Sequence, residues 1–97
     1  MPDIEVLLLT QQHCAYCDDA KALLERLSSD FPLHVQIVDI STPEGQRLAA
    51  QGGVMFPPGL FLDQAPFSYG RPSERKLRKA LRRKLADAPD QSTPANT

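Results

Sequence analysis

The chain has 97 residues, of which 41% are hydrophobic, and its 11 basic and 12 acidic residues leave a formal net charge of −1. This length supports one small domain and is too short for two, and the composition excludes a disordered or fibrous chain. No apolar run approaches the roughly 18 residues of a membrane-spanning helix, and the N-terminus has no basic region ahead of a long apolar core. We therefore expect a cytoplasmic protein without a membrane partner.

The first predicted elements surround the only two cysteines of the chain. Residues 4–10 form a nearly continuous run of branched apolar side chains, which is typical of a strand covered on both faces. After a short loop come Cys14 and Cys17, and residues 16–29 carry apolar side chains at helical spacing. These apolar positions are Ala20, Leu23, Leu24 and Leu27. The cysteines thus lie at the carboxyl end of a strand, where open α/β sheets gather their sites.

The spacing of the cysteines predicts thiol–disulfide chemistry. The first turn of a helix offers unpaired N–H groups and a positive dipole end, and both favour a thiolate. We therefore assign Cys14 as the nucleophile and Cys17 as the thiol that resolves a mixed disulfide formed at Cys14. The charges of Asp18 and Asp19 oppose a thiolate, so we expect only moderate activation of Cys14. A single pair at this spacing fits a reducing compartment, where disulfides are transient.

Two other interpretations of the cysteine pair stay open. The same spacing supplies half of a tetrahedral zinc site, but the only other soft ligands are His13 and His34. A zinc or copper module would use Cys14 and Cys17 together with His13 or with a second chain. Alternatively, the cysteines are inert buried residues. We expect no bound metal, and we expect His34 to be exposed because it occupies a polar position in a predicted strand.

The middle of the chain alternates strands and a helix. A helix between two strands calls for a parallel, right-handed crossover. Ser41 is the predicted cap of a second helix, with Pro43 in its first turn, and Gly52 with Gly53 ends it. Two short strands then form an antiparallel hairpin through residues 64–66. The strands predicted in this part of the chain are residues 33–40, 60–63 and 67–69.

The last predicted helix begins at Ser73, its cap, and runs to about residue 86. Its polar face carries a run of basic residues: Arg75, Lys76, Arg78, Lys79, Arg82, Arg83 and Lys84. Such a face can bind nucleic acid, but no aromatic platform accompanies it, so nucleic acid is not expected. It is otherwise a solvated face or a dock for an acidic protein. Residues 87–97 are small, polar and proline-bearing, and we expect a disordered tail after a domain of residues 1–86.

The residues around the cysteines resemble the glutaredoxin family. Cys14-Ala15-Tyr16-Cys17-x-x-Ala20-Lys21-x-Leu23-Leu24 is similar to the glutaredoxin active site and first helix, Cys-Pro-Tyr-Cys-x-x-Ala-Lys-x-Leu-Leu, with alanine in place of proline. Residues 58–63 are similar to the segment in which glutaredoxins and thioredoxins carry a cis-proline and then a strand. The resemblance covers most of residues 4–86. It implies an α/β thioredoxin fold of order β-α-β-α-β-β-α, with a four-stranded mixed sheet flanked by three helices and a cis-proline at Pro58.

Three departures from the glutaredoxin pattern argue against strict dependence on glutathione. The family generally has a lysine three positions before the first cysteine to pair with a glutathione carboxylate, and this chain has Gln11 there. The residue before the cis-proline exchanges backbone hydrogen bonds with glutathione, but Pro57 has no N–H to donate. Residues 69–74 do not match the Gly-Gly-x-Asp-Asp pattern that holds the other end of glutathione. Arg71 and the helix start at Ser73 remain candidates to bind a carboxylate.

The residues and the resemblance together predict a dithiol–disulfide oxidoreductase that acts on protein or small-molecule disulfides. With no bound cofactor, its oxidised pair would be reset by a low-molecular-weight thiol or a reductase. We expect a monomer. A non-catalytic adaptor that binds a partner through the basic last helix is a further alternative, because one fold hosts unrelated functions. The expected catalytic residues are Cys14 and Cys17, and the expected substrate-binding residues are Tyr16, Pro57, Pro58, Arg71 and Ser73.

Overall fold

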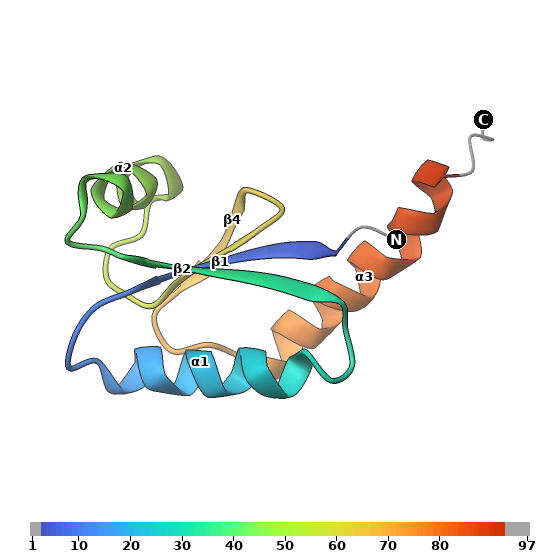
Figure 1. Ribbon diagram of the computed structural model, residues 1–97, viewed down its shortest axis with the longest axis horizontal. Helices are drawn as coiled ribbons and strands as arrows, with labels where there is room; N and C mark the ends of the chain where they lie inside the picture. The colour runs from blue at the N-terminus through green and yellow to red at the C-terminus, as the bar shows by residue number, and fades with distance from the viewer. Residues whose placement is uncertain (1–2, 93–97) are drawn as a thin grey trace.

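The structure, a computed structural model, describes residues 3–92 and the side chains of residues 3–86. Strands and helices alternate in the predicted order (Figure 1). They are β1 (Ile4–Thr10), α1 (Ala15–Leu27), β2 (Leu33–Asp39), α2 (Pro43–Gly52), β3 (Gly59–Leu62), β4 (Ala65–Tyr69) and α3 (Glu74–Ser92).

The four strands form one mixed sheet in the order β2-β1-β3-β4. β1 pairs with β2 in parallel and with β3 antiparallel, and β3 and β4 form an antiparallel hairpin. Helices α1 and α3 lie on one face of this sheet and α2 lies on the other (Figure 1). The predicted thioredoxin fold, with three helices around a four-stranded mixed sheet, is therefore confirmed.

Strand β1 is buried on both faces, as its apolar run predicts. Ile4, Val6 and Leu8 belong to the core under α1 and α3, whereas Leu9 belongs to a smaller core under α2. Successive side chains of a strand point to opposite faces, so this alternation follows from the pleat. The apolar stripe of α1 meets the first core, where its three leucines are nearly inaccessible to water. The sheet is thus fixed from both sides.

Helix α3 is held by apolar and charged contacts. Leu77 and Leu81 are fully buried against the core shared with α1. Outside the core, the Glu74 carboxylate accepts hydrogen bonds from Arg26 of α1 and from Arg78 of α3, at 3.0 and 3.1 Å. Arg78 also pairs with Asp30, after the end of α1, at 3.0 Å. These exposed pairs orient α3, but each contributes little stability because water screens it.

Several predicted boundaries inside the chain shift by one or two residues, and two of these shifts have a clear cause. Thr42, not Ser41, caps α2: its hydroxyl oxygen accepts the Gly45 N–H at 3.0 Å, which places Pro43 at the first helical position. The hairpin turns at Asp63 and Gln64, where φ is 49° and 73°, and not at residues 64–66. A tight hairpin turn needs positive φ at both central residues, so the strand β4 begins earlier than predicted.

The Ser41 hydroxyl and N–H instead donate hydrogen bonds to the Asp39 carboxylate, at 2.6 and 2.7 Å. These two bonds hold the pKa of Asp39 below its ordinary value, with the hydroxyl making the larger contribution. Ser41 therefore orders the turn between β2 and α2.

Helix α3 runs to Ser92, six residues past the predicted domain end at residue 86. Ala86 and Ala88 are strong helix formers, which favours this continuation. The rest of the predicted tail, residues 93–97, lies outside the described residues. None of the helices described is long and apolar enough to cross a membrane.

Candidate active site

Three loops meet at one end of the sheet. Strand β1 ends at Thr10, which leads to the cysteines, and its neighbour Leu9 faces Gly59 at the start of β3. Gly59 in turn faces Tyr69 at the end of β4. The Gly70 N–H donates a hydrogen bond to the Pro58 carbonyl at 2.8 Å, which ties two of these loops together. The pairing of the strands thus brings the cysteine loop, the proline loop and the end of β4 to the same end of the sheet, whereas α3 begins farther along α1, where Glu74 binds Arg26 (Figure 1).

The cysteines occupy the first turn of α1, as predicted. Cys14 is the residue that caps the helix, and its Sγ accepts the Cys17 N–H at 3.1 Å. The two residues form a disulfide, with their Cα atoms 5.2 Å apart. The N–H groups and the positive end of the helix that surround Cys14 Sγ favour a thiolate at this position after reduction.

The two sulfurs differ in access to solvent. Cys14 is half-buried, whereas Cys17 is 1% exposed and packs inside the first turn of α1. An external disulfide can therefore reach Cys14 and not Cys17. This asymmetry gives Cys14 the geometry of an attacking sulfur and leaves Cys17 as the sulfur behind it.

The loop before Cys14 makes a sharp turn. His13 has a φ of 56°, in the left-handed region that non-glycine residues seldom adopt and that histidine tolerates better than most. The chain thereby passes from the end of β1 into α1 over residues 11–14. The His13 side chain is exposed.

The proline loop carries the predicted cis bond between Pro57 and Pro58. Pro58 is fully buried, whereas Pro57 is half-buried. Neither proline has an N–H, and the Pro58 carbonyl already accepts the Gly70 N–H, so this loop offers a ligand no backbone donor at these two positions. A bound peptide or thiol can therefore only donate to, and not accept from, the backbone of the proline pair.

Large exposed apolar side chains gather at this end of the sheet. We call Tyr16, Met55, Phe56 and Tyr69 the apolar rim. Tyr16 belongs to the turn that holds the disulfide, Met55 and Phe56 precede the proline pair, and Tyr69 ends β4. Their exposed fractions run from 43% to 76%, and Phe56 and Tyr69 meet edge to face with ring centroids 5.2 Å apart. Among the described residues, Ile37 is the only other large hydrophobic residue exposed to this degree.

Of these four residues, the sequence analysis assigned a site role only to Tyr16. Phe56 directly precedes the proline pair, which is the signal that could have identified it.

Arg71 and Ser73 lie at the start of α3, with different surroundings from those predicted. Arg71 is exposed and lines a groove of about 250 Å³ between α1 and the loop before α3, to which neither cysteine contributes. Asp19 and Glu74 line the same groove. The pKa of Glu74 is lowered by hydrogen bonds from two arginines, of which Arg26 makes the larger contribution and Arg78 the smaller. The Ser73 hydroxyl accepts the Lys76 N–H at 3.2 Å and so caps α3.

A metal site is not assembled within the described part of the chain. No group of three or more His, Cys, Asp or Glu side chains lies close enough there to hold an ion. His34 is exposed, as predicted, and binds Glu5 instead, with 2.8 Å between Nδ1 and Oε1. A metal bound by Cys14 and Cys17 would therefore need ligands from another chain.

Comparisons with known proteins agree with this geometry. Solved structures with the same fold include a thioredoxin variant from Halobacterium salinarum, with a TM-score of 0.64 and 24% identity over 81% of this chain and 72% of that one. A thioredoxin from Thermus thermophilus gives 0.62 and 22%, over 93% and 79% of the two chains. Oxidised thioredoxin O2 from Arabidopsis thaliana gives 0.64 and 17%, over 84% and 74%.

At these identities the likeness establishes the fold alone. A search of curated proteins finds no match. The disulfide-bonded pair at the start of α1, on a thioredoxin-like fold, indicates a redox function. Residues 5–82 match the family described as Glutaredoxin-like domain (DUF836), and the chain belongs to that family.

Proposed function

We propose that the protein is a dithiol–disulfide oxidoreductase that reduces disulfides through Cys14 and Cys17. The observation that carries this proposal is the unequal burial of the two cysteines, with Cys14 partly exposed at the helix cap and Cys17 only 1% exposed. A carrier of electrons between disulfides needs one sulfur that meets the substrate and one that meets only the first sulfur.

The exchange runs in two steps. The Cys14 thiolate attacks one sulfur of a substrate disulfide, a Cys14–substrate bond forms, and the other substrate sulfur leaves as a thiolate. The Cys17 thiolate then attacks Cys14 Sγ, the Cys14–Cys17 bond forms, and the second substrate thiolate leaves. The pair thus loses two electrons, and the protons of its two thiols end on the two product thiols. A low-molecular-weight thiol or a reductase reverses the change.

The apolar rim supports a polypeptide as the substrate. Four large exposed apolar side chains at the end of the sheet that carries the disulfide offer contacts to apolar side chains that flank a substrate cysteine. Glutathione offers a charged backbone instead, and this end of the sheet has Gln11 and Pro57 where recognition of that backbone needs a cation and an N–H. We propose a cytoplasmic location, because the reducing conditions there would return the oxidised Cys14–Cys17 pair to its two thiols.

Trapping of the intermediate tests this proposal. Cys17→Ser removes the resolving sulfur, so we expect a stable mixed disulfide between Cys14 and a disulfide-bearing protein, detected as an added mass in non-reducing mass spectrometry. Cys14→Ser, the matched control with the same loss of one sulfur, should form no adduct because Cys17 is buried. Equal adducts on both variants, or none on Cys17→Ser, would refute the assigned roles.

A further inference from the structure

The sheet has one edge that nothing in the described chain covers. Strand β2 lies at the end of the order β2-β1-β3-β4, so only one of its sides is paired. It has seven residues in unbroken register with β1, from Ile4 opposite Leu33 to Thr10 opposite Asp39. A long, regular edge strand is a template for another strand, because it presents a row of unpaired N–H and C=O groups.

The hydrogen bonds at both ends of β2 show which of its backbone groups point outward. The Ile4 N–H donates to the Pro32 carbonyl, and the Ile40 N–H donates to the Thr10 carbonyl, each at 2.8 Å. The backbone groups of residues 32 and 40 therefore point toward β1. Because the direction of the backbone N–H and C=O groups alternates along a strand, the even-numbered residues between them also point toward β1. The N–H and C=O groups of Leu33, Val35 and Ile37 point away from the sheet.

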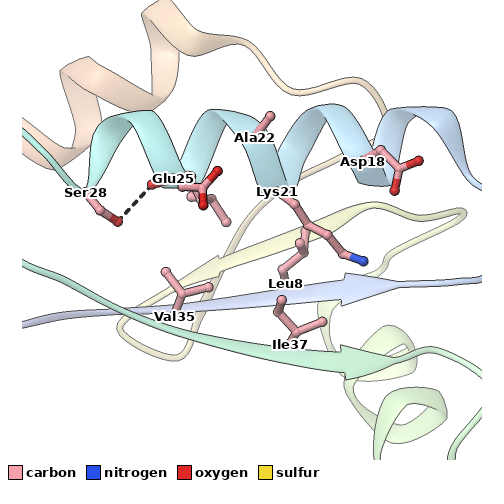
Figure 2. A pocket seen from close by; sticks show the side chains of 9 residues that line it. Leu8, Asp18, Lys21, Ala22, Glu25, Ser28, Val35 and Ile37 are labelled. Atoms are coloured by element: carbon pink, nitrogen blue, oxygen red, sulfur yellow. Dashed lines mark hydrogen bonds between the residues drawn. The ribbon is translucent and has the colours of Figure 1, made fainter.

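The same three residues carry apolar side chains that are incompletely covered. These side chains lie on the face of the sheet that α1 covers. Leu33 and Val35 are half-buried there, and Ile37 is 51% exposed. A groove of about 560 Å³ runs between β2 and α1, with Leu8, Val35 and Ile37 along its strand side (Figure 2). Its helix side carries charges of both signs, Asp18, Lys21 and Glu25. Outward backbone groups and an uncovered apolar face thus coincide in one strand.

The opposite edge of the sheet lacks these properties. Strand β4 contains Pro66, which has no N–H, and its pairing with β3 shifts register between Leu60 and Phe61. Prolines and bulges are the devices by which proteins prevent pairing at an edge. Strand β2 has neither. The two edges therefore differ in the feature that decides whether another strand can be added.

We propose that β2 is a dimer interface that pairs antiparallel with β2 of a second copy of this chain, about a two-fold axis at Val35. Val35 then faces the partner's Val35, and Leu33 faces the partner's Ile37. All of these residues have outward backbone groups, so each facing pair exchanges both N–H···O bonds. On the face that α1 covers, the facing side chains are all apolar. They cover the groove between β2 and α1 in each copy.

The register follows from what the alternatives would bring together. Moving the two-fold axis to Gln36 would place Leu33 opposite the partner's Asp39, an apolar side chain against a carboxylate, and moving it to His34 would place the two His34 side chains opposite each other. In the proposed register, His34 faces the partner's Gln36 on the other side of the sheet, so no like charges meet. Self-complementarity about a two-fold axis is what an isologous interface requires, and this is why a second copy is favoured over an unrelated strand.

Sedimentation and light scattering from low micromolar to millimolar concentration test the interface. We expect the mass to rise toward that of a dimer. Ile37→Glu, at a position that is 51% exposed in the single chain, should raise the dimer dissociation constant by about tenfold or more, because it places two carboxylates in the buried apolar seam. Gln36→Glu is the matched control, with the same charge change at the adjacent exposed residue on the opposite face, and it should not raise the constant, because in this register its carboxylate faces the imidazole of the partner's His34.

Amide hydrogen exchange gives a second measurement that does not depend on a variant. The amides of Leu33, Val35 and Ile37 should gain protection as the concentration rises, whereas those of His34 and Gln36, which already bond to β1, should be protected throughout. A monomer at every concentration would overturn the proposal. So would a dimer that Ile37→Glu leaves intact, or one in which the three outward amides exchange as fast as in the monomer.

Discussion

At the scale of single residues, the two cysteines differ in burial. Both sulfurs lie in the same helical turn, within one disulfide, yet only Cys14 is open to solvent. A thiol that is buried meets no external disulfide, whatever its pKa. In the proposed mechanism this difference in burial makes Cys14 the attacking sulfur, and the helix N-terminus favours its thiolate.

The apolar rim yields a prediction about substrate choice. Phe56→Ser should raise KM for the reduction of a protein disulfide by about five- to tenfold, because burial of an apolar side chain by a bound polypeptide is worth about 1.5–3 kcal/mol and Phe56 is already half-covered. The same variant should reduce a small disulfide such as hydroxyethyl disulfide at the rate of the parent protein, because that substrate does not reach the ring. Steady-state kinetics with both substrates separates the two effects. An equal loss on both would place Phe56 in the chemistry and not in recognition.

The spacing of the cysteines predicted the redox pair and the resemblance to glutaredoxins predicted the cis bond at Pro58, but neither could predict the apolar rim. A motif fixes the place of Cys14 and Cys17 through their spacing alone. Met55 and Phe56, by contrast, are apolar residues near a strand, and such residues are as often buried as exposed. Only the packing of the loop on β4 shows that Phe56 faces Tyr69 and water instead of the core.

At the scale of elements, an exposed pair on the sheet joins β1 to β2. His34 of β2 binds Glu5 of β1, and this hydrogen bond, followed by the charge of Glu5, raises the pKa of His34 above its ordinary value. Because the folded-state pKa is the higher one, the pair stabilises the fold fully below the pKa of the unfolded chain. The contribution is lost as the pH rises through the folded-state pKa.

Glu5→Gln should therefore lower the pKa of His34, as measured by NMR titration of its ring protons. The urea midpoint of unfolding should also change less in this variant than in the parent protein when the pH is raised from below to above the pKa of His34. The effect on stability is small, since both side chains are exposed and screened. A His34 pKa that does not move in Glu5→Gln would show that the pair does not form in solution.

The packing of α3 against the core predicts a larger effect on the free energy of unfolding. Leu81 is fully buried against the core shared with α1, so Leu81→Ala should lower the free energy of unfolding by about 2–5 kcal/mol. Arg82→Ala changes the next residue, which is exposed, and should stay within about 0.5 kcal/mol of the parent. Urea unfolding followed by circular dichroism measures both. Similar losses in the two variants would mean that α3 does not pack through this face.

Element types followed from the sequence, whereas their ends did not. The apolar periodicities of α1 and β1 are long and regular, and both elements appear where they were expected. The cap of α2 moved from Ser41 to Thr42 because two hydroxyl residues stand side by side, and only the bond from Ser41 to Asp39 decides between them. The end of α3 moved because short stretches rich in alanine suit a helix as well as a tail.

At the scale of the whole molecule, the topology brings distant parts of the chain to one end of the sheet. The cysteines follow β1, the prolines precede β3 and Gly70 follows β4, so three segments far apart in sequence lie at the end of the sheet that carries the disulfide. The same topology leaves β2 at an open edge, away from that end. The proposed redox chemistry and the proposed self-association would therefore use different parts of one sheet, and a loss of either can be measured without the other.

The resemblance predicted this topology, while the groove beside β2 could not be predicted from it. The alternation of Leu33, Val35 and Ile37 indicates that one face of the strand is apolar, but it does not show whether a helix covers that face. In the structure, α1 covers Leu8 and leaves Ile37 half-exposed.

The reduction potential of the Cys14–Cys17 pair tests the proposed activity most directly. It is measured by equilibrating the protein in graded thiol–disulfide buffers and trapping the free thiols. We predict a single two-electron transition between about −180 and −270 mV, the range of known carriers of this kind. Failure of the two cysteines to form their disulfide at any poise would contradict the dithiol mechanism and favour a metal-binding or adaptor role.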